Sequence, residues 1–174
     1  MFRNINMLRL FFEEPAREFN VREVARLIKV APATASKQLS SLAKSDILQE
    51  REERRFKLYK ANLNSEHYKD LKIYYNIRKI RESGLLAALD NFYLKPAVVL
   101  FGAASHGLDT ETSDFDLLVI SEKTQEFAEN KKFEKILGRP LQIFIFKNIK
   151  DIKNKYLLNN MLNGIVLQGE VKWI

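Results

Sequence analysis

The sequence contains no cysteine, which excludes a disulfide framework, a thiolate zinc site and a cysteine nucleophile. Only two histidines are present, so a histidine-built metal centre is nearly excluded as well. No apolar run approaches the roughly 20 residues that a membrane-spanning helix needs. The apolar stretch near the start is followed at once by acidic residues, with no cleavage site of small residues. We therefore expect a soluble, cytoplasmic protein with no membrane partner.

Apolar residues make up 46% of the 174 residues, which is enough to build a core in one ordinary domain or in two small ones. The positive charge is distributed unevenly along the chain. Residues 1–63 contain 13 Lys and Arg against 8 Asp and Glu, whereas residues 64–174 contain 16 against 14. Basicity concentrated in a small N-terminal module suits a polyanion such as nucleic acid.

The apolar spacing of the first third predicts three helices followed by two strands. The first helix should end before Pro15, and Asn20 should cap the second. Pro32 suits the first turn of the third helix, because its missing N–H has no partner there in any case. A charged turn at residues 51–54 should join the two strands.

From residue 65 to about residue 93 the pattern is helical again, and Gly84 is the expected break between two helices. Beyond Pro96, short apolar strands alternate with helices, which is typical of an α/β unit. Strands are expected at 98–101, 115–120 and 141–146, and helices near 124–137 and 149–162.

The sequence thus predicts an α/β (α+β) chain in three parts. An N-terminal domain should occupy residues 1–64, a linker helix residues 65–83, and a C-terminal domain with a small mixed sheet residues 84–174. The aromatic residues of the helical segment 66–93, at helical spacing, suit a core or a dimer interface better than a stacking platform for nucleic acid, and a homodimer through this segment stays open.

The first 62 residues, with VREVARLIKVAPATASKQLSSLAKSDILQEREERRFKLYKAN at their heart, resemble a winged helix-turn-helix of bacterial and archaeal transcription regulators. The resemblance implies that the third helix enters the major groove of double-stranded DNA and that the hairpin contacts the backbone or a minor groove. A winged helix used for protein contacts stays open as an alternative. The residues expected to contact DNA are Ala33, Thr34, Ser36, Lys37, Gln38, Arg54, Arg55 and Lys57.

The stretch VVLFGAASHGLDTETSDFDLLVI, residues 98–120, carries a second pattern. Gly102 and Ala103 follow an apolar strand, and ten residues, 104–113, separate them from Asp114-Phe115-Asp116. Glycine lets a backbone approach a triphosphate closely. Two acids two residues apart on a strand point to one face, where their carboxylates can hold Mg²⁺. In the intervening loop, Asp109 and Glu111 are expected to be solvated charges.

Nearly all of residues 84–174 looks like the minimal nucleotidyltransferases of the DNA polymerase β superfamily. The resemblance implies that Asp114 and Asp116 are catalytic Mg²⁺ ligands and that an NTP is the substrate. The residues implied to contact the nucleotide are Gly102, Ala103, Ser105 and Gly107. Two positions depart from the family pattern, because Ala103 replaces a Ser and Gln142 stands where a third carboxylate is implied. An amide neither carries that charge nor accepts a proton at neutral pH.

These observations leave two functions open. One is a DNA-binding protein whose second domain binds Mg-NTP and transfers a nucleoside monophosphate to a hydroxyl. The other is a transcription regulator, or an antitoxin-like partner of a small helical toxin-type protein, whose degenerate domain only senses nucleotide or mediates protein contacts.

Overall fold

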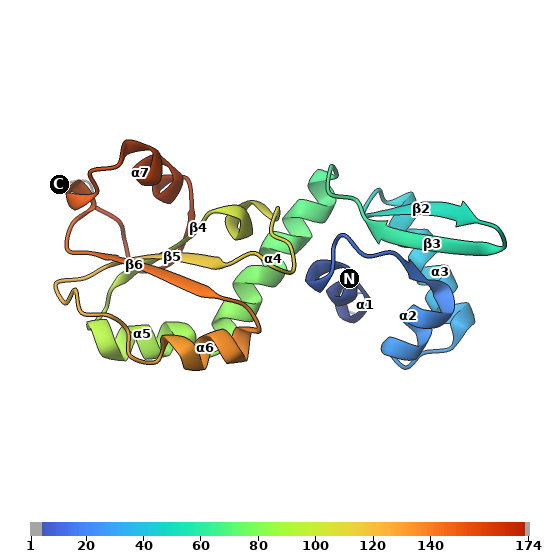
Figure 1. Cartoon of the computed structure of the whole chain (residues 1–174), viewed down its shortest axis with the longest axis horizontal. Helices are drawn as coiled ribbons and strands as arrows, with labels where there is room; N and C mark the ends of the chain where they lie inside the picture. Colours follow the sequence, from blue (N-terminus) through green and yellow to red (C-terminus); the bar gives the residue numbers. More distant parts are fainter. Residues whose placement is uncertain (1–4, 173–174) are drawn as a thin grey trace. The chain divides into compact units, whose positions relative to one another are not determined.

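The computed structural model describes residues 5–172 and divides the chain into two compact units, one ending at Lys72 and one beginning at Ile73 (Figure 1). The first four residues of the predicted domain 1–64 and the last two residues of the predicted domain 84–174 lie outside the described residues. The architecture is mixed α/β with two small sheets, which confirms the predicted fold class. Within residues 5–172, no helix is long and apolar enough to cross a membrane.

The N-terminal unit contains α1 (Ile5–Glu13), β1 (Phe19–Asn20), α2 (Val21–Leu27), α3 (Pro32–Lys44), β2 (Leu48–Glu53) and β3 (Phe56–Ala61). Its strands form an antiparallel sheet in the order β1-β3-β2. Both predicted helix starts are confirmed. Asn20 Oδ1 accepts a hydrogen bond from the Glu23 amide at 2.9 Å, and Pro32 opens α3.

The core of this unit is built from the buried faces of α1, α3 and the sheet. The rings of Phe11 and Phe19 meet edge to face with centroids 5.2 Å apart. The first turns of α4 (Glu66–Glu82) join this core, because Tyr68 is buried and donates its hydroxyl hydrogen to the Phe11 carbonyl at 2.9 Å. The division between the two units falls inside α4, in the range predicted as a linker helix.

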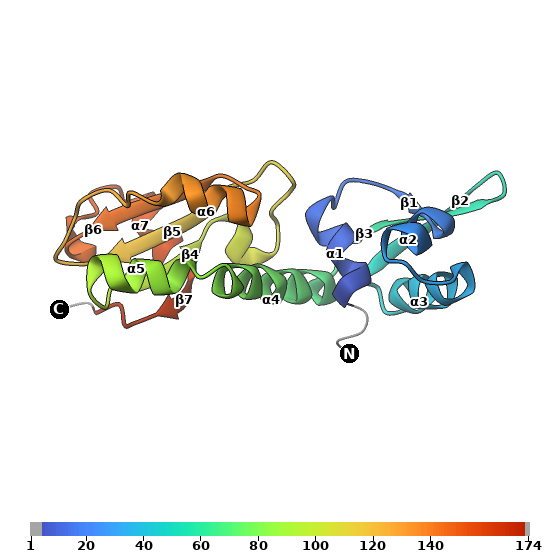
Figure 2. The ribbon, with the colours of Figure 1, turned by 90° about the horizontal axis from the view of Figure 1, so that it is seen from below.

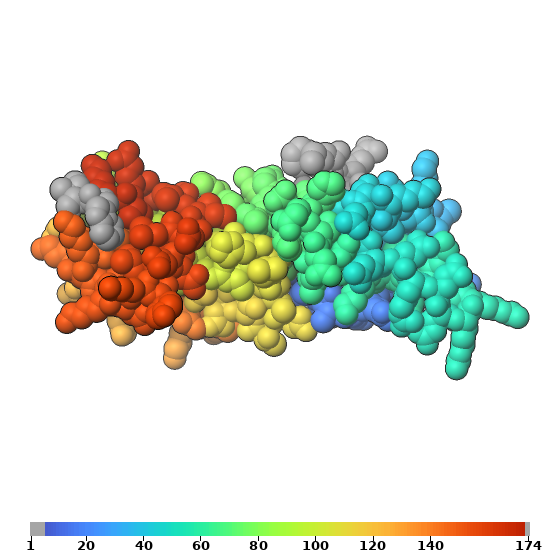
Figure 3. Space-filling model, turned by 90° about the horizontal axis from the view of Figure 1, so that it is seen from above, coloured from blue at the N-terminus to red at the C-terminus, as the bar shows by residue number. Residues whose placement is uncertain are grey.

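The hairpin of β2 and β3 is tighter than the sequence predicts. Residues 51–53 were expected in the turn but extend β2, because they pair in register with β3, as Arg51 does with Leu58. The turn therefore contracts to Arg54 and Arg55, and Arg54 adopts a left-handed backbone with φ of 56°. Side chains of this hairpin stand out from the surface of the unit (Figure 3).

The C-terminal unit has α5 (Leu85–Tyr93), β4 (Ala97–Phe101), the 3₁₀ turn η2 (Ala103–His106), β5 (Phe115–Ile120), α6 (Asn130–Leu137), β6 (Leu141–Phe146), η3 (Ile149–Asp151), α7 (Lys155–Leu162) and β7 (Ile165–Gln168). The sheet order is β6-β5-β4-β7, with β5 and β6 parallel and the other pairs antiparallel. Helices α5 and α6 cover one face of the sheet and α7 the other (Figures 1 and 2).

Two helices of this unit are shorter than predicted. The chain before Asn130 runs as turns that bury Phe127, whose ring stacks on Phe133 with centroids 5.9 Å apart. The helix expected at 149–162 is divided into η3 and α7. The division arises because the Asn154 side chain accepts the first free amides of α7 and so starts a new helix.

Alternate residues of β5 serve the two faces of the sheet. Phe115, Leu117 and Val119 pack in the core under α5 and α6. Leu118 and Ile120 pack on the other face, in the core that includes Met161 of α7. By the same alternation, Asp116 lies on the face of the sheet that α7 covers, at the end where its apolar residues begin.

Candidate functional site

A row of side chains crosses three strands at one end of the C-terminal sheet. Asp116 pairs in register with Phe101 of β4 and with Gln142 of β6. Residues paired in register project from the same face of a sheet. Two residues further along, Leu118 pairs with Phe144, and both lie in the core on the α7 side. Asp116 and Gln142 are therefore the polar edge of an otherwise apolar face.

The backbone leaves β4 through Gly102, whose φ of 72° and ψ of −158° lie in a region that essentially only glycine adopts. A Cβ at this position would collide with Asp116 Oδ2. The following turn closes on itself, since Ser105 donates its amide to the Gly102 carbonyl at 3.2 Å and its hydroxyl at 2.8 Å. The main chain consequently lies directly against the Asp116 carboxylate.

Three polar side chains converge next to this turn. Asp114 was expected on the same strand as Asp116, but β5 begins at Phe115, so Asp114 lies immediately before the strand, where it is half-buried. Gln142 donates its Nε2 hydrogen to Asp114 Oδ2. Burial raises the pKa of the Asp116 carboxyl above its ordinary value, and the negative charge of Asp114 raises that pKa further. The Gln142 amide thus lies beside the two carboxylates of Asp114 and Asp116, which we call the acid pair.

The donor set fits one hard divalent cation. Carboxylate oxygens and a side-chain amide oxygen are ligands that Mg²⁺ accepts. A cation would also offset the burial and the repulsion from Asp114 that together raise the pKa of Asp116. Within residues 5–172, no group of three or more His, Cys, Asp or Glu side chains could hold a metal ion. The site suits a cation shared with a ligand that supplies oxygens of its own, such as a chain of phosphates, and lacks the acids for a second cation.

The remaining residues implied to contact a nucleotide belong to the same turn. Ala103 is exposed and carries no hydroxyl. Ser105 is buried and its hydroxyl is engaged with the Gly102 carbonyl, so it stabilises the turn. Gly107 ends the turn with a φ of 66°. The contacts of these residues with a nucleotide stay predictions.

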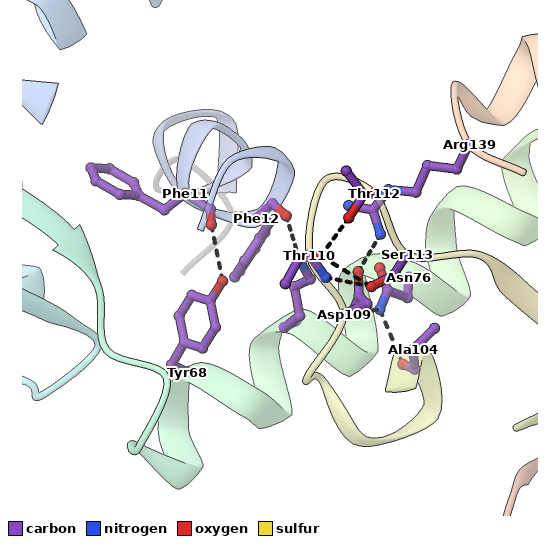
Figure 4. A network of polar contacts seen from close by, with 11 residues as sticks. Phe11, Phe12, Tyr68, Asn76, Ala104, Asp109, Thr110, Thr112, Ser113 and Arg139 are labelled. Atoms are coloured by element: carbon purple, nitrogen blue, oxygen red, sulfur yellow. Dashed lines mark hydrogen bonds and ion pairs between the residues drawn. The ribbon is translucent and has the colours of Figure 1, made fainter. Parts of the chain in front are cut away.

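The prediction that Asp109 is a solvated loop charge is wrong, whereas Glu111 is exposed as expected. Asp109 is 1% exposed and accepts a hydrogen bond from Asn76 Nδ2 at 2.7 Å. Its other oxygen pairs with the guanidinium of Arg139 (Figure 4). Asn76 and Arg139 were not predicted as part of any site. No local pattern indicates them, because they lie 33 and 30 residues from Asp109 in the sequence.

The residues predicted to contact DNA lie on α3 and the β2–β3 hairpin of the N-terminal unit. Residues 33, 34 and 37 on α3 are exposed, and Ser36 and Gln38 are half-buried. Ala33, Thr34, Lys37, Gln38 and Ser41 line a shallow hollow on this helix. All three hairpin cations are exposed, but Lys57 is paired with Glu50 at 2.6 Å.

Phe56 follows the two turn arginines and is 56% exposed. Phe56 lies at the end of the hairpin, where Lys57 is exposed as well, whereas Tyr59 and Ala61 further along β3 are buried.

Comparison with known protein families matches residues 77–167 to the nucleotidyltransferase domain. The match spans more than half of the chain and contains every side chain of the acid-pair site. Comparison with curated proteins finds no match.

Proposed function

The chain belongs to the nucleotidyltransferase domain family, and from that premise we propose that it is a DNA-binding regulator whose C-terminal unit binds Mg-NTP but transfers the nucleotide poorly. The observation that carries this proposal is the contact between Gln142 and Asp114. An amide occupies the place next to the acid pair where the resemblance to minimal nucleotidyltransferases implies a third carboxylate. The site keeps the two acids proposed to bind the cation, and it lacks the third carboxylate that the transfer step is expected to need.

Asp114 and Asp116 would hold the cation, which when bound neutralises charge on the phosphates of the nucleotide. Because Gly102 has no Cβ, the main chain lies directly against Asp116. The backbone would therefore lie close to phosphates that share the cation with Asp116. Gln142 gives a hydrogen to Asp114 Oδ2 and so occupies a lone pair on that oxygen. The amide thereby holds the Asp114 side chain in place while adding no negative charge.

Transfer to a hydroxyl requires that a base accept the hydroxyl proton. The Gln142 amide cannot do so at neutral pH, and Ala103 has no polar group. Loss of general-base assistance typically costs about 10²–10⁴-fold in rate. A nucleotide bound at such a site is not consumed quickly by transfer, which favours the regulator over the efficient transferase.

DNA is the proposed partner of the N-terminal unit. The order α1, α2, α3 and hairpin, with Ala33, Thr34 and Lys37 exposed on the N-terminal half of α3, supports the resemblance to a winged helix. Lys37, Arg54 and Arg55 have no ion-pair partner within the described part of the chain, so their charges are available to phosphates. Lys57 is engaged with Glu50 and contributes less.

Calorimetric titration of the full chain with ATP, in the presence and absence of Mg²⁺, tests the nucleotide site. We expect binding only with Mg²⁺, because the triphosphate would otherwise face two uncompensated carboxylates. Combined Asp114→Asn and Asp116→Asn substitution should weaken binding at least as much as the roughly 10–100-fold loss known for groups that merely surround a metal site.

The matched control is Glu111→Gln, which removes one negative charge from the exposed part of the same loop. This variant should bind as the unmodified protein does. Metal-dependent affinity that survives in the double variant would mean that the nucleotide binds elsewhere.

A further inference from the structure

An ion pair lies in the interior of the C-terminal unit. The side chains of Asp109 and Arg139 are 0% and 2% exposed. Removing two charges from water is costly, and well-packed apolar residues in place of such a pair often leave a protein equally or more stable. A gain in stability therefore does not explain why this ion pair is present in the interior.

Through Asn76, Asp109 connects the turn after Gly102 with the loop of residues 109–113 that leads to Asp114. Asn76 Nδ2 donates both to Asp109 Oδ1, at 2.7 Å, and to the carbonyl of Ala104 inside η2, at 3.0 Å (Figure 4). The loop that begins at Asp109 is tightened by a hydrogen bond from the Thr110 amide to Ser113 Oγ at 2.9 Å. The next residue after this loop is Asp114.

Arg139 connects the same carboxylate with the strands that carry the site. Its guanidinium carbon lies 5.5 Å from the centroid of the Phe115 ring, and Phe115 is the residue between the two site acids. The Phe115 amide donates to the Pro140 carbonyl at 2.9 Å, which joins the start of β5 to the segment just before β6. Gln142 follows two residues later.

We propose that Asp109 is a positioning residue, which fixes from the interior the three segments that carry Gly102, Asp114 and Gln142. Its Oδ1 holds the turn through Asn76, and its Oδ2 holds the start of β6 through Arg139. The effect of this residue on nucleotide affinity rests on the proposed function, whereas its effect on the geometry of the site does not.

The geometric effect is measured on the nucleotide-free full chain by NMR. The side-chain amide of Gln142, assigned by its loss in Gln142→Leu, reports the hydrogen bond to Asp114. In Asp109→Asn this amide should exchange with solvent about tenfold faster or more. An unchanged exchange rate in folded Asp109→Asn overturns the proposal.

Ser121→Ala is the matched control, since it removes a buried hydrogen bond, from Ser121 Oγ to the Tyr93 carbonyl at 3.0 Å, just after the opposite end of β5. This variant should lower the melting temperature of the protein without altering the Gln142 amide. An equal change of that amide in Ser121→Ala would mean that it reports general loosening, and this too overturns the proposal.

Titration with Mg-ATP separates the two proposals. Asp109→Asn should weaken binding roughly 10–100-fold, as loss of a group behind a metal site does, while Ser121→Ala should not. If the unmodified protein binds no Mg-ATP, the proposed function fails and the amide measurement alone decides the role of Asp109.

Asp109→Asn removes the carboxylate that pairs with the buried Arg139 guanidinium and is the variant most at risk of not folding. Two further variants avoid that risk. Asn76→Ala removes the link to Ala104 without stranding a charge, and Asp109→Asn combined with Arg139→Gln removes both charges together. Faster exchange of the Gln142 amide in these variants supports the proposal, and wild-type exchange in both overturns it.

Discussion

The two units of this chain use charged side chains in opposite ways. In the N-terminal unit, Arg51 and Lys57 are paired with acids while their side chains remain 50% and 45% exposed. Exposed pairs of this kind contribute little to stability, because water and salt screen the attraction. In the C-terminal unit the pair of Asp109 and Arg139 is almost fully enclosed. Charged side chains of the first kind lie at the surface, whereas those of the second kind are enclosed and can act only on the chain itself.

Under the proposed function, the surface of the N-terminal unit would recognise DNA, and the interior of the C-terminal unit would hold the site residues in place. A surface that binds a polyanion needs charge in the right region and tolerates mobile side chains. A site that holds a cation and a triphosphate needs its ligands fixed, and residues behind the ligands provide that.

The largest effect is expected from restoring the implied third carboxylate in the C-terminal unit. Gln142→Asp, alone and with Ala103→Ser, should raise nucleotide transfer by about 10²–10⁴-fold, because it supplies both a base and a ligand for a second cation. Gln142→Glu offers the same charge at the original side-chain length. Transfer is measured with radiolabelled NTP, using the cell's own proteins and RNAs as acceptors.

The chain contains a matched control for this substitution. Gln168 also lies on a strand and donates its Nε2 hydrogen to an aspartate, Asp90, at 2.8 Å. Gln168→Asp makes the same chemical change away from the acid pair and should leave transfer unaltered. An ordinary enzymatic rate in the unmodified protein would contradict the account of Gln142.

A smaller effect is expected on the surface of the N-terminal unit. If Lys37, Arg54 and Arg55 neutralise about three phosphates, the logarithm of the affinity for duplex DNA should fall with the logarithm of salt concentration with a slope near −2.7. Affinity would then drop roughly 40-fold between 50 and 200 mM salt. Replacement of all three residues by Ala should remove most of this dependence.

Arg51→Ala is the control for the triple variant, because Arg51 is an exposed cation on the same hairpin that already pairs with Glu18 and Glu53. Its loss should change the salt slope less than the loss of Arg54 does. DNA binding that is insensitive to salt, or that survives the triple substitution, would exclude this surface as the DNA contact.

Local patterns were sufficient to predict much of the C-terminal site. Strands 115–120 and 141–146 lie where their apolar runs predict them. The position of Gln142 then follows from the parallel pairing of these strands, which sets it opposite Asp116. Glycine at position 102 was predicted from the need for close approach, and the collision that a Cβ would make with Asp116 gives the physical reason.

The buried network could not be predicted in this way. Periodicity identifies apolar faces, whereas Asn76, Asp109 and Arg139 are polar residues that only the tertiary fold brings together. The hairpin turn was misplaced for a related reason, because a run of charged residues is typical of a loop, but cross-strand pairing holds residues 51–53 in β2. A homodimer and a small helical partner protein remain predictions.

The acid pair and Gln142 are proposed to form a site for one divalent cation with nucleotide. The most direct test counts Mn²⁺ ions bound to the full chain by equilibrium dialysis with electron paramagnetic resonance, in the presence of a slowly hydrolysed ATP analogue. The account predicts one Mn²⁺ per unmodified chain and a second only in Gln142→Asp. No bound Mn²⁺, or two in the unmodified protein, would contradict it.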